Sequence, residues 1–351
     1  MDSLTHTVSG AALLLALPRR PATAWAVPLS MTVAALPDID VFFPRSSIDF
    51  LLLHRGITHA LPALPAFALL CAIFMYPFWK RGTPDAWTFG QTALFAFLLL
   101  LLHVWLDCVT TYGTLALLPF SDFRVRLNGL FIVDLWLLAV LIPACYAARR
   151  RPRIAAAAMT CLLLYSGGAV LWRMHLEDAW NASFRANGIV PLQLSVLPDA
   201  FAPLHWKVQY KHDGHCFQAP LSWNGVRTGP WQRQQSADPF LLARLAAEDR
   251  SARIWTSFSL LPLQDEREQG AGKEYDFYDW RFASLVPFAQ RIQDWRRNGA
   301  TPFRLMARVD GEGKLVAVRY IGSAGGGDSG WQPPVAPKGR SGIRRLTGLD
   351  D

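Results

Sequence analysis

Long apolar runs fill the first half of this chain of 351 residues and constrain its fold more than any other feature. The strongest signal lies in the segment 88–109, where residues 93–102 are ten apolar residues without interruption. About twenty apolar residues in a helix cross the hydrocarbon core of a bilayer. This segment is therefore predicted to be a membrane-spanning helix.

Five further apolar segments accompany it, and each of the six is a predicted helix. The six cover residues 4–17, 25–36, 58–79, 88–109, 131–148 and 153–174. The third, fourth and sixth are long enough to span a bilayer, the fifth nearly so, and the first two are short. The sequence predicts a mainly α polytopic membrane domain of about six helices.

The second half of the chain has a different pattern. Residues 175–322 read as a smaller α+β extramembrane domain, so the membrane domain is predicted to end at residue 174. The segments 205–210 and 252–260 alternate like strands, residues 303–322 are a predicted hairpin, and a helix is expected over about 238–249. Gly, Ser, Pro and Arg dominate residues 323–351, which predicts a disordered tail.

Basic residues gather in the short loops between the apolar segments, although the whole chain has a net charge of +8. They lie at 19–20, 80–81 and 149–153, in the first, third and fifth connections. The preference of Lys and Arg for the cytoplasmic side then assigns loops 37–57 and 110–130, with the C-terminal half, to the opposite side. Because no aromatic residues are interleaved with these basic residues, no nucleic-acid binding is expected.

Eight ionisable side chains from five segments are predicted to lie at one level on that opposite face. They are His6, Asp38, Asp40, His54, His59, His103, Asp107 and Asp134. Carboxylates and imidazoles at bilayer depth cost several kcal/mol unless they are paired, hydrated or metal-bound. When such side chains surround a divalent cation, the cation compensates the negative charge of the carboxylates and they compensate its positive charge. We predict that these eight residues ligate metal.

The spacing of these residues supports a shared site. His103 and Asp107 are four residues apart and so lie on one face of a helix. Asp38 and Asp40, which follow Pro37, are expected to be extended, with carboxylates on opposite sides. One carboxylate can then ligate while the other orients a histidine through its second ring nitrogen.

Each residue taken alone also has a simpler explanation. His6 can be a capping or packing residue, and Asp38 and Asp40 can be turn residues. Asp134 lies near a predicted helix N-terminus, where a carboxylate is stabilised without any metal. The metal hypothesis therefore rests on the combination of residues.

The predicted donor set contains His and Asp without Cys, which suits Zn²⁺, Mn²⁺ or Fe. Eight groups exceed the needs of one tetrahedral ion, so two ions are expected, or three. Clustered metals about 3.5–4 Å apart activate water and shield phosphate charge in phosphoester hydrolysis. In that chemistry Asp40 or Asp38 would be the general base, and Arg55 would stabilise the developing charge.

Five motifs in residues 1–140 resemble the YdjM-like family of inner-membrane metal-dependent hydrolases. They are "MDSLTH", "LPDID", "HRGITH", "HVWLDCVTTYGTLALLPF" and "FIVDLW". That family is distantly similar to zinc-dependent phospholipase C and P1-type nucleases. The resemblance implies a helical core of that type, zinc, phosphodiesterase activity and a multi-pass location in the bacterial inner membrane. It also implies that His103 and Asp107 are the HxxxD metal pair.

The sequence thus predicts a membrane-bound metal-dependent hydrolase that cleaves a phosphoester of a lipid or lipid-linked substrate. Because the basic loops are assigned to the cytoplasmic side, the site and the C-terminal domain are predicted to face the periplasm. The alternative is a metal-binding membrane transporter or scaffold without hydrolase activity. A lipid phosphatase of the PAP2 type also uses HxxxD, but its KxxxxxxRP and PSGH motifs are absent from this sequence.

Overall fold

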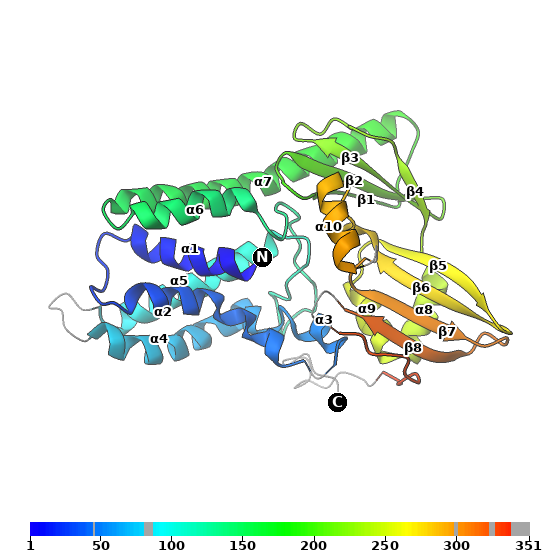
Figure 1. The fold of residues 1–351 in the computed structure, drawn as a ribbon, viewed down its shortest axis with the longest axis horizontal. Coiled ribbons are helices and arrows are strands. Elements are labelled where there is room, and N and C mark those ends of the chain that lie inside the picture. The colour runs from blue at the N-terminus through cyan, green and yellow to red at the C-terminus, as the bar shows by residue number, and fades with distance from the viewer. Residues whose placement is uncertain (45, 81–86, 298–300, 323–326, 338–351) are drawn as a thin grey trace. The chain divides into compact units, whose positions relative to one another are not determined.

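The structure is a computed structural model, and it describes residues 1–44, 46–80, 87–297, 301–322 and 327–337 (Figure 1). The chain forms two compact units. The first unit comprises Met1–Phe42 and Arg55–Arg173, and the second comprises Phe43–His54 and Met174–Asp351.

The first unit is a bundle whose helices coincide with the six predicted apolar segments. They are α1 (Ser3–Ala16), α2 (Ala26–Ala35), α4 (Leu64–Lys80), α5 (Phe89–Cys108), α6 (Leu135–Ala147) and the first part of α7 (Pro152–Ala186). Short 3₁₀ helices join them at one end: η1 (Leu36–Phe42), η2 (Ile57–His59) and η3 (Leu61–Ala63). Apolar side chains from α1, α2, α4 and α5 pack into one core cluster, and those from α1, α5, α6 and α7 into another.

Three helices in the described part of the chain are long and apolar enough to cross a membrane. They are Leu61–Trp79, Phe89–Cys108 and Pro152–Ala186, as predicted from segment length. Large apolar side chains such as Phe74, Leu164 and Leu171 are largely exposed on these helices. Exposed apolar side chains of this size suit a lipid environment better than water.

Helices α1 and α2 are in backbone contact at Gly10. A Cβ atom added at Gly10 would lie 2.4 Å from Ala34 Cβ and 2.6 Å from the Ser30 carbonyl oxygen. No side chain fits at those distances, so the close approach of the two helices requires glycine. This contact fixes α1 against α2.

Replacing Gly10 with alanine is therefore expected to push the helices apart and lower the free energy of unfolding by about 1–3 kcal/mol. The matched control is Gly167→Ala in α7, where an added Cβ has no neighbour within 4 Å. Alanine there is expected to be neutral or to stabilise by up to about 1 kcal/mol. Unfolding of both variants in detergent measures the difference, and equal shifts would contradict the close contact.

The second unit contains two four-stranded antiparallel sheets, in which the strands follow their chain order (Figure 1). The first consists of β1 (Gln193–Pro198), β2 (His205–His212), β3 (His215–Ser222) and β4 (Gln232–Gln235). The second consists of β5 (Pro262–Gln269), β6 (Gly272–Asp279), β7 (Arg304–Val309) and β8 (Leu315–Ile321). The remaining elements are α3 (Asp49–Leu53), the end of α7, α8 (Pro239–Glu248), α9 (Arg250–Phe258), η4 (Trp280–Phe282) and α10 (Pro287–Arg297).

Several local predictions for this unit are confirmed. β2 covers the predicted strand 205–210, and α8 covers the predicted helix. The predicted hairpin is the β7–β8 pair, whose turn is closed by a hydrogen bond from the Asp310 amide to the Lys314 carbonyl.

The strand predicted over 252–260 is wrong, because this segment belongs to α9. Asp249 caps α9 by accepting a hydrogen bond from the Ala252 amide. Ala252, Trp255 and Phe258 are buried, and their spacing of three residues is helical. The alternation in the sequence was misleading because both periods fit so short a segment.

Part of the predicted disordered tail is also ordered. Val318 pairs with Gln332 and Ile321 pairs with Asp328 along β8. Asp328 and Gln332 thus pair with β8, and residues 323–326 and 338–351 of the predicted tail lie outside the described residues.

Candidate metal centre

One end of the first unit collects most of the predicted ligands. His6 lies in the first turns of α1, Asp38 and Asp40 lie on η1, His59 ends η2, and His103 and Asp107 lie in the last turns of α5. Because α1 begins at the end of the bundle where α5 stops, residues distant in sequence share one level.

The local conformation around Asp38 differs from the prediction. An extended chain was expected after Pro37, but α2 continues into the 3₁₀ helix η1 and Leu36 remains in the α region. Pro37 lies in the first turn of η1, where its missing N–H costs no hydrogen bond. Asp38 and Asp40 therefore project from one short helix. Asp40 is buried, whereas Asp38 is partly exposed.

Four ligand atoms lie within 4.8 Å of one another, one each from Asp38, His59, His103 and Asp107. The Nε2 atoms of His59 and His103 are 3.0 Å apart, and Asp107 Oδ2 lies 3.1 and 3.3 Å from them. Asp38 Oδ1 lies 3.6 Å from each of the same two nitrogens. A tetrahedral ion with bonds of about 2.0–2.1 Å places its ligands about 3.3 Å apart. The observed spacings of 3.0–3.6 Å bracket that value.

Outer hydrogen bonds aim both histidines at the centre of the cluster. Nδ1 of His103 lies 2.7 Å from the Ala34 carbonyl oxygen, an acceptor that requires the proton on Nδ1. Nδ1 of His59 lies 3.3 Å from Asp40 Oδ2 and 2.9 Å from Thr58 Oγ1. In metal sites such partners fix the ring and leave Nε2 as the ligand. Asp40 therefore orients His59, while Asp38 faces the cluster.

Unpaired buried atoms show that these residues fit a cation. Asp107 Oδ2 is buried and has no hydrogen-bond partner, although two histidine nitrogens lie beside it. The His6 ring stacks on the His103 ring, and its Nδ1 is also buried without a hydrogen-bond partner. An unpaired buried acceptor costs about 1–3 kcal/mol. A divalent ion among the four ligand atoms would remove that cost for Asp107.

Arg55 holds the other oxygen of Asp107. Its Nη2 lies 2.7 Å from Asp107 Oδ1, and its Nη1 donates to Thr110 Oγ1 at 2.9 Å. The guanidinium also lies over the Tyr112 ring, 4.9 Å from the centroid. The Met1 amino group and His6 Nε2 contact the same Oδ1. Asp107 is thus fixed through Oδ1 and presents Oδ2 to the cluster.

The backbone of Arg55 takes part as well. Its φ of 61° lies in the left-handed region, and its N–H donates to Asp40 Oδ2 at 2.9 Å. Such a conformation costs a non-glycine residue about 1–3 kcal/mol unless its surroundings hold it. The contacts of its backbone and side chain with two carboxylates hold it here.

The pKa values of the two ligands outside the membrane-spanning segments reflect this crowding. Burial lowers the pKa of His59, but the neighbouring carboxylates of Asp107, Asp38 and Asp40 outweigh burial and raise it to about 10. Burial raises the pKa of Asp38, yet the neighbouring imidazole rings of His103 and His59 hold it well below its usual range. Carboxylate charge at the cluster therefore favours a proton or a metal cation, and metal binding releases the proton.

Asp134, one of the predicted ligands, has a different role. Asp134 caps α6, where Oδ1 accepts hydrogen bonds from the amides of Trp136 and Leu137 and Oδ2 accepts one from the Tyr165 hydroxyl. Capping, the simpler explanation, accounts for this carboxylate, so Asp134 is left out of the ligand set. His54 belongs to the segment grouped with the second unit, and its ring stacks on Phe50.

Sequence reasoning missed the residues that support Arg55. Thr110 and Tyr112 follow Asp107 directly in "DCVTTYG", and both contact the guanidinium. Polar residues immediately after a predicted ligand helix were the available signal.

Replacing Asp40 with asparagine is expected to lower metal affinity about 10–100-fold, as substitution of an outer partner usually does. The amide keeps an acceptor for the Arg55 N–H but removes the charge beside His59. Titration against a competing chelator measures the change. Asp178→Asn, at an exposed position of α7, is the control and should leave affinity unchanged. Equal affinity in both variants would remove Asp40 from the site.

The first half of the chain resembles known proteins. The chain is 32% identical over 136 residues to the uncharacterized protein YfhP of Bacillus subtilis. That match covers 36% of this chain and 40% of YfhP, so the chain spans less than half of that relative. No solved structure matches the chain. Residues 1–176, half of the chain, match the YdjM inner membrane protein family, and the protein belongs to that family.

Proposed function

We propose that this membrane protein is a metal-dependent hydrolase that cleaves a phosphoester of a lipid or lipid-linked substrate. The observation that carries the proposal is the spacing of the ligand atoms of Asp38, His59, His103 and Asp107. Their His and Asp donors suit zinc, and manganese and iron accept the same donors. These four atoms account for one ion. A second or third ion would need further ligands such as His6 or Asp40.

The residues in and around the cluster have different proposed roles. A divalent ion bound there would screen phosphate charge, and through a fifth coordination position it would activate water. Asp38 contributes Oδ1 to the cluster and is the partly exposed carboxylate among the four residues, so its Oδ2 is the candidate proton acceptor. Asp40 acts through His59 as a positioning residue. Arg55 positions Asp107 and keeps a fixed positive charge beside the site.

The position of the cluster in the bundle supports a lipid substrate. It lies at the end of apolar helices that are long enough to span a bilayer. Large side chains at that end, among them Phe42, Phe120 and Phe123, are exposed. A site at that level meets phospholipid head groups first. The proposed orientation, from the loop charges, is towards the periplasm of the inner membrane.

Chelation tests the proposal against its rivals. The zinc-loaded protein should hydrolyse bis(4-nitrophenyl) phosphate or phospholipid in vesicles, lose activity with EDTA and regain it with zinc. Hydrolysis that is insensitive to EDTA would favour a phosphatase of the PAP2 type. Metal flux in proteoliposomes without hydrolysis of either ester would favour a transporter.

A further inference from the structure

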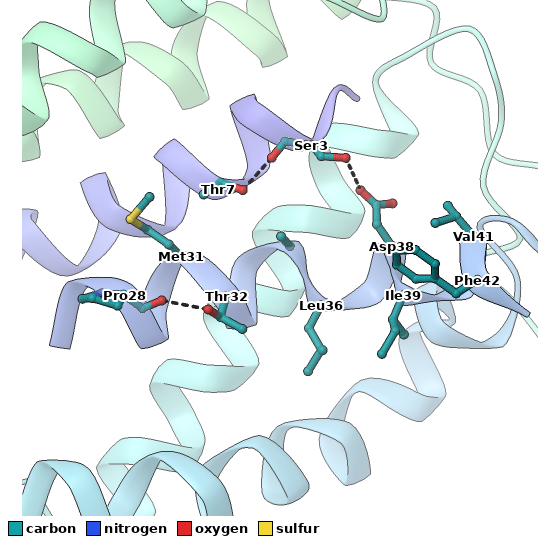
Figure 2. A pocket seen from close by; sticks show the side chains of 11 residues that line it. Ser3, Thr7, Pro28, Met31, Thr32, Leu36, Asp38, Ile39, Val41 and Phe42 are labelled. Atoms are coloured by element: carbon teal, nitrogen blue, oxygen red, sulfur yellow. Dashed lines mark hydrogen bonds between the residues drawn. The ribbon is translucent and has the colours of Figure 1, made fainter. Parts of the chain in front are cut away.

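A pocket with a volume of about 780 Å³ adjoins the metal centre in the first unit. Ser3 and Thr7 of α1 line one side, and residues of α2 and η1, including Asp38, line the other (Figure 2). Small-molecule sites usually have volumes of about 300–1,000 Å³. The pocket is therefore large enough for a ligand and opens beside the cluster.

Asp38 belongs to both the pocket and the cluster. Its side chain is 14% exposed, while the side chains of His59, His103 and Asp107 are 0% exposed. Among these four residues, Asp38 is thus the point at which a ligand reaches the metal centre. A ligand that contacts Asp38 from the pocket has its remaining atoms against the pocket wall.

The pocket wall is apolar except near Asp38. The hydrocarbon surface of the wall comes from Met31, Leu36, Ile39, Val41 and Phe42.

The hydroxyls of the wall are already occupied. Thr7 Oγ1 donates to the Ser3 carbonyl, and Thr32 Oγ1 donates to the Pro28 carbonyl (Figure 2). Ser3 Oγ donates to Asp38 at 3.4 Å. Asp38 is the single charged residue of the described lining. The pocket therefore combines one ionic end with an apolar body.

We infer that this pocket holds the hydrocarbon chain of the substrate, with the phosphoester at Asp38 and the metal centre. The inference rests on the proposed hydrolase function and adds that an amphiphile with a long alkyl or acyl chain is preferred. A lipid in the outer half of the bilayer offers this combination. A water-soluble phosphoester would leave the apolar wall unused.

The test uses two 4-nitrophenyl phosphodiesters that differ only in their second alcohol, butyl or dodecyl. Each methylene that becomes fully buried strengthens binding by about fourfold, so even partial burial should favour the dodecyl ester by at least about tenfold in kcat/KM. The assay uses the full-length zinc-loaded protein in detergent. Partition of the dodecyl ester into micelles is the same for all variants, so the comparison between variants decides.

Ala35→Phe, at a pocket-lining position, is expected to fill part of the pocket and to reduce the dodecyl preference at least about tenfold. Metal content and hydrolysis of the butyl ester should persist. The matched control is Ala66→Phe at an exposed position of α4 outside the pocket lining, which should keep the wild-type preference. Equal preference in both variants, or none in the wild type, would overturn the inference while leaving the hydrolase proposal intact.

Binding of dodecyl phosphate and butyl phosphate, measured by calorimetry, separates the two proposals. Stronger binding of dodecyl phosphate that is lost in Ala35→Phe and kept in Ala66→Phe supports the pocket even if neither ester is hydrolysed. In that case the hydrolase proposal fails alone. Equal binding of the two phosphates by the wild type would overturn the pocket.

Discussion

Replacing His103 with alanine is expected to remove the bound divalent ion and all metal-dependent hydrolysis. His103 Nε2 is within 3.6 Å of three other ligand atoms, and its ring is locked by the Ala34 carbonyl. Outer partners alone change metal affinity about 10–100-fold, so loss of a ligand should exceed about 100-fold. Elemental analysis and turnover, measured on the same preparation, test both effects together.

The control for this variant is His205→Ala, at an exposed position at the start of β2. It should retain the metal content and activity of the wild type. Full metal occupancy in His103→Ala would contradict the assignment of the site. Full turnover without metal would contradict the proposed chemistry.

Replacing Arg55 with methionine is expected to destabilise the protein by about 3–5 kcal/mol, the usual cost of removing one partner from a buried ion pair. Methionine keeps much of the side-chain volume, so the loss reflects charge. Asp107 would remain fully buried without the guanidinium on Oδ1. Unfolding in detergent with EDTA measures the effect, and saturating zinc should reduce it because the ion also neutralises Asp107.

Two comparisons make the Arg55 result specific. Arg150→Met, at an exposed position after α6, should change stability by no more than about 0.5 kcal/mol. The double variant Arg55→Met with Asp107→Asn should recover part of the loss, because the buried carboxylate charge that had lost its guanidinium partner is gone. Equal stability of Arg55→Met and Arg150→Met would show that the Arg55–Asp107 pair does not stabilise the fold.

The sequence predicted the parts of the site that depend on helix direction. Apolar segment lengths located the helices, and short connections placed the start of α1 and the end of α5 at one end of the bundle. His103 and Asp107 share a face because four residues make about one helical turn. The wider ligand set followed because buried ionisable groups need compensating charge.

Other features depend on contacts that the local sequence does not encode. Asp134 and Asp107 both adjoin an apolar helix, but Asp134 meets the Tyr165 hydroxyl and two amides, whereas Asp107 meets Arg55. The left-handed turn at Arg55 depends on Asp40, fifteen residues earlier. The same limit explains the error at α9. The spacing of its buried residues identifies a helix, but which residues are buried depends on tertiary contacts.

X-ray absorption spectroscopy of the protein loaded with one equivalent of zinc tests the central claim most directly. We expect a shell of imidazole nitrogen and carboxylate oxygen at about 2.0–2.2 Å without sulfur. Zinc that is lost on dialysis, or a shell with sulfur at about 2.3 Å, would contradict a centre built from Asp38, His59, His103 and Asp107.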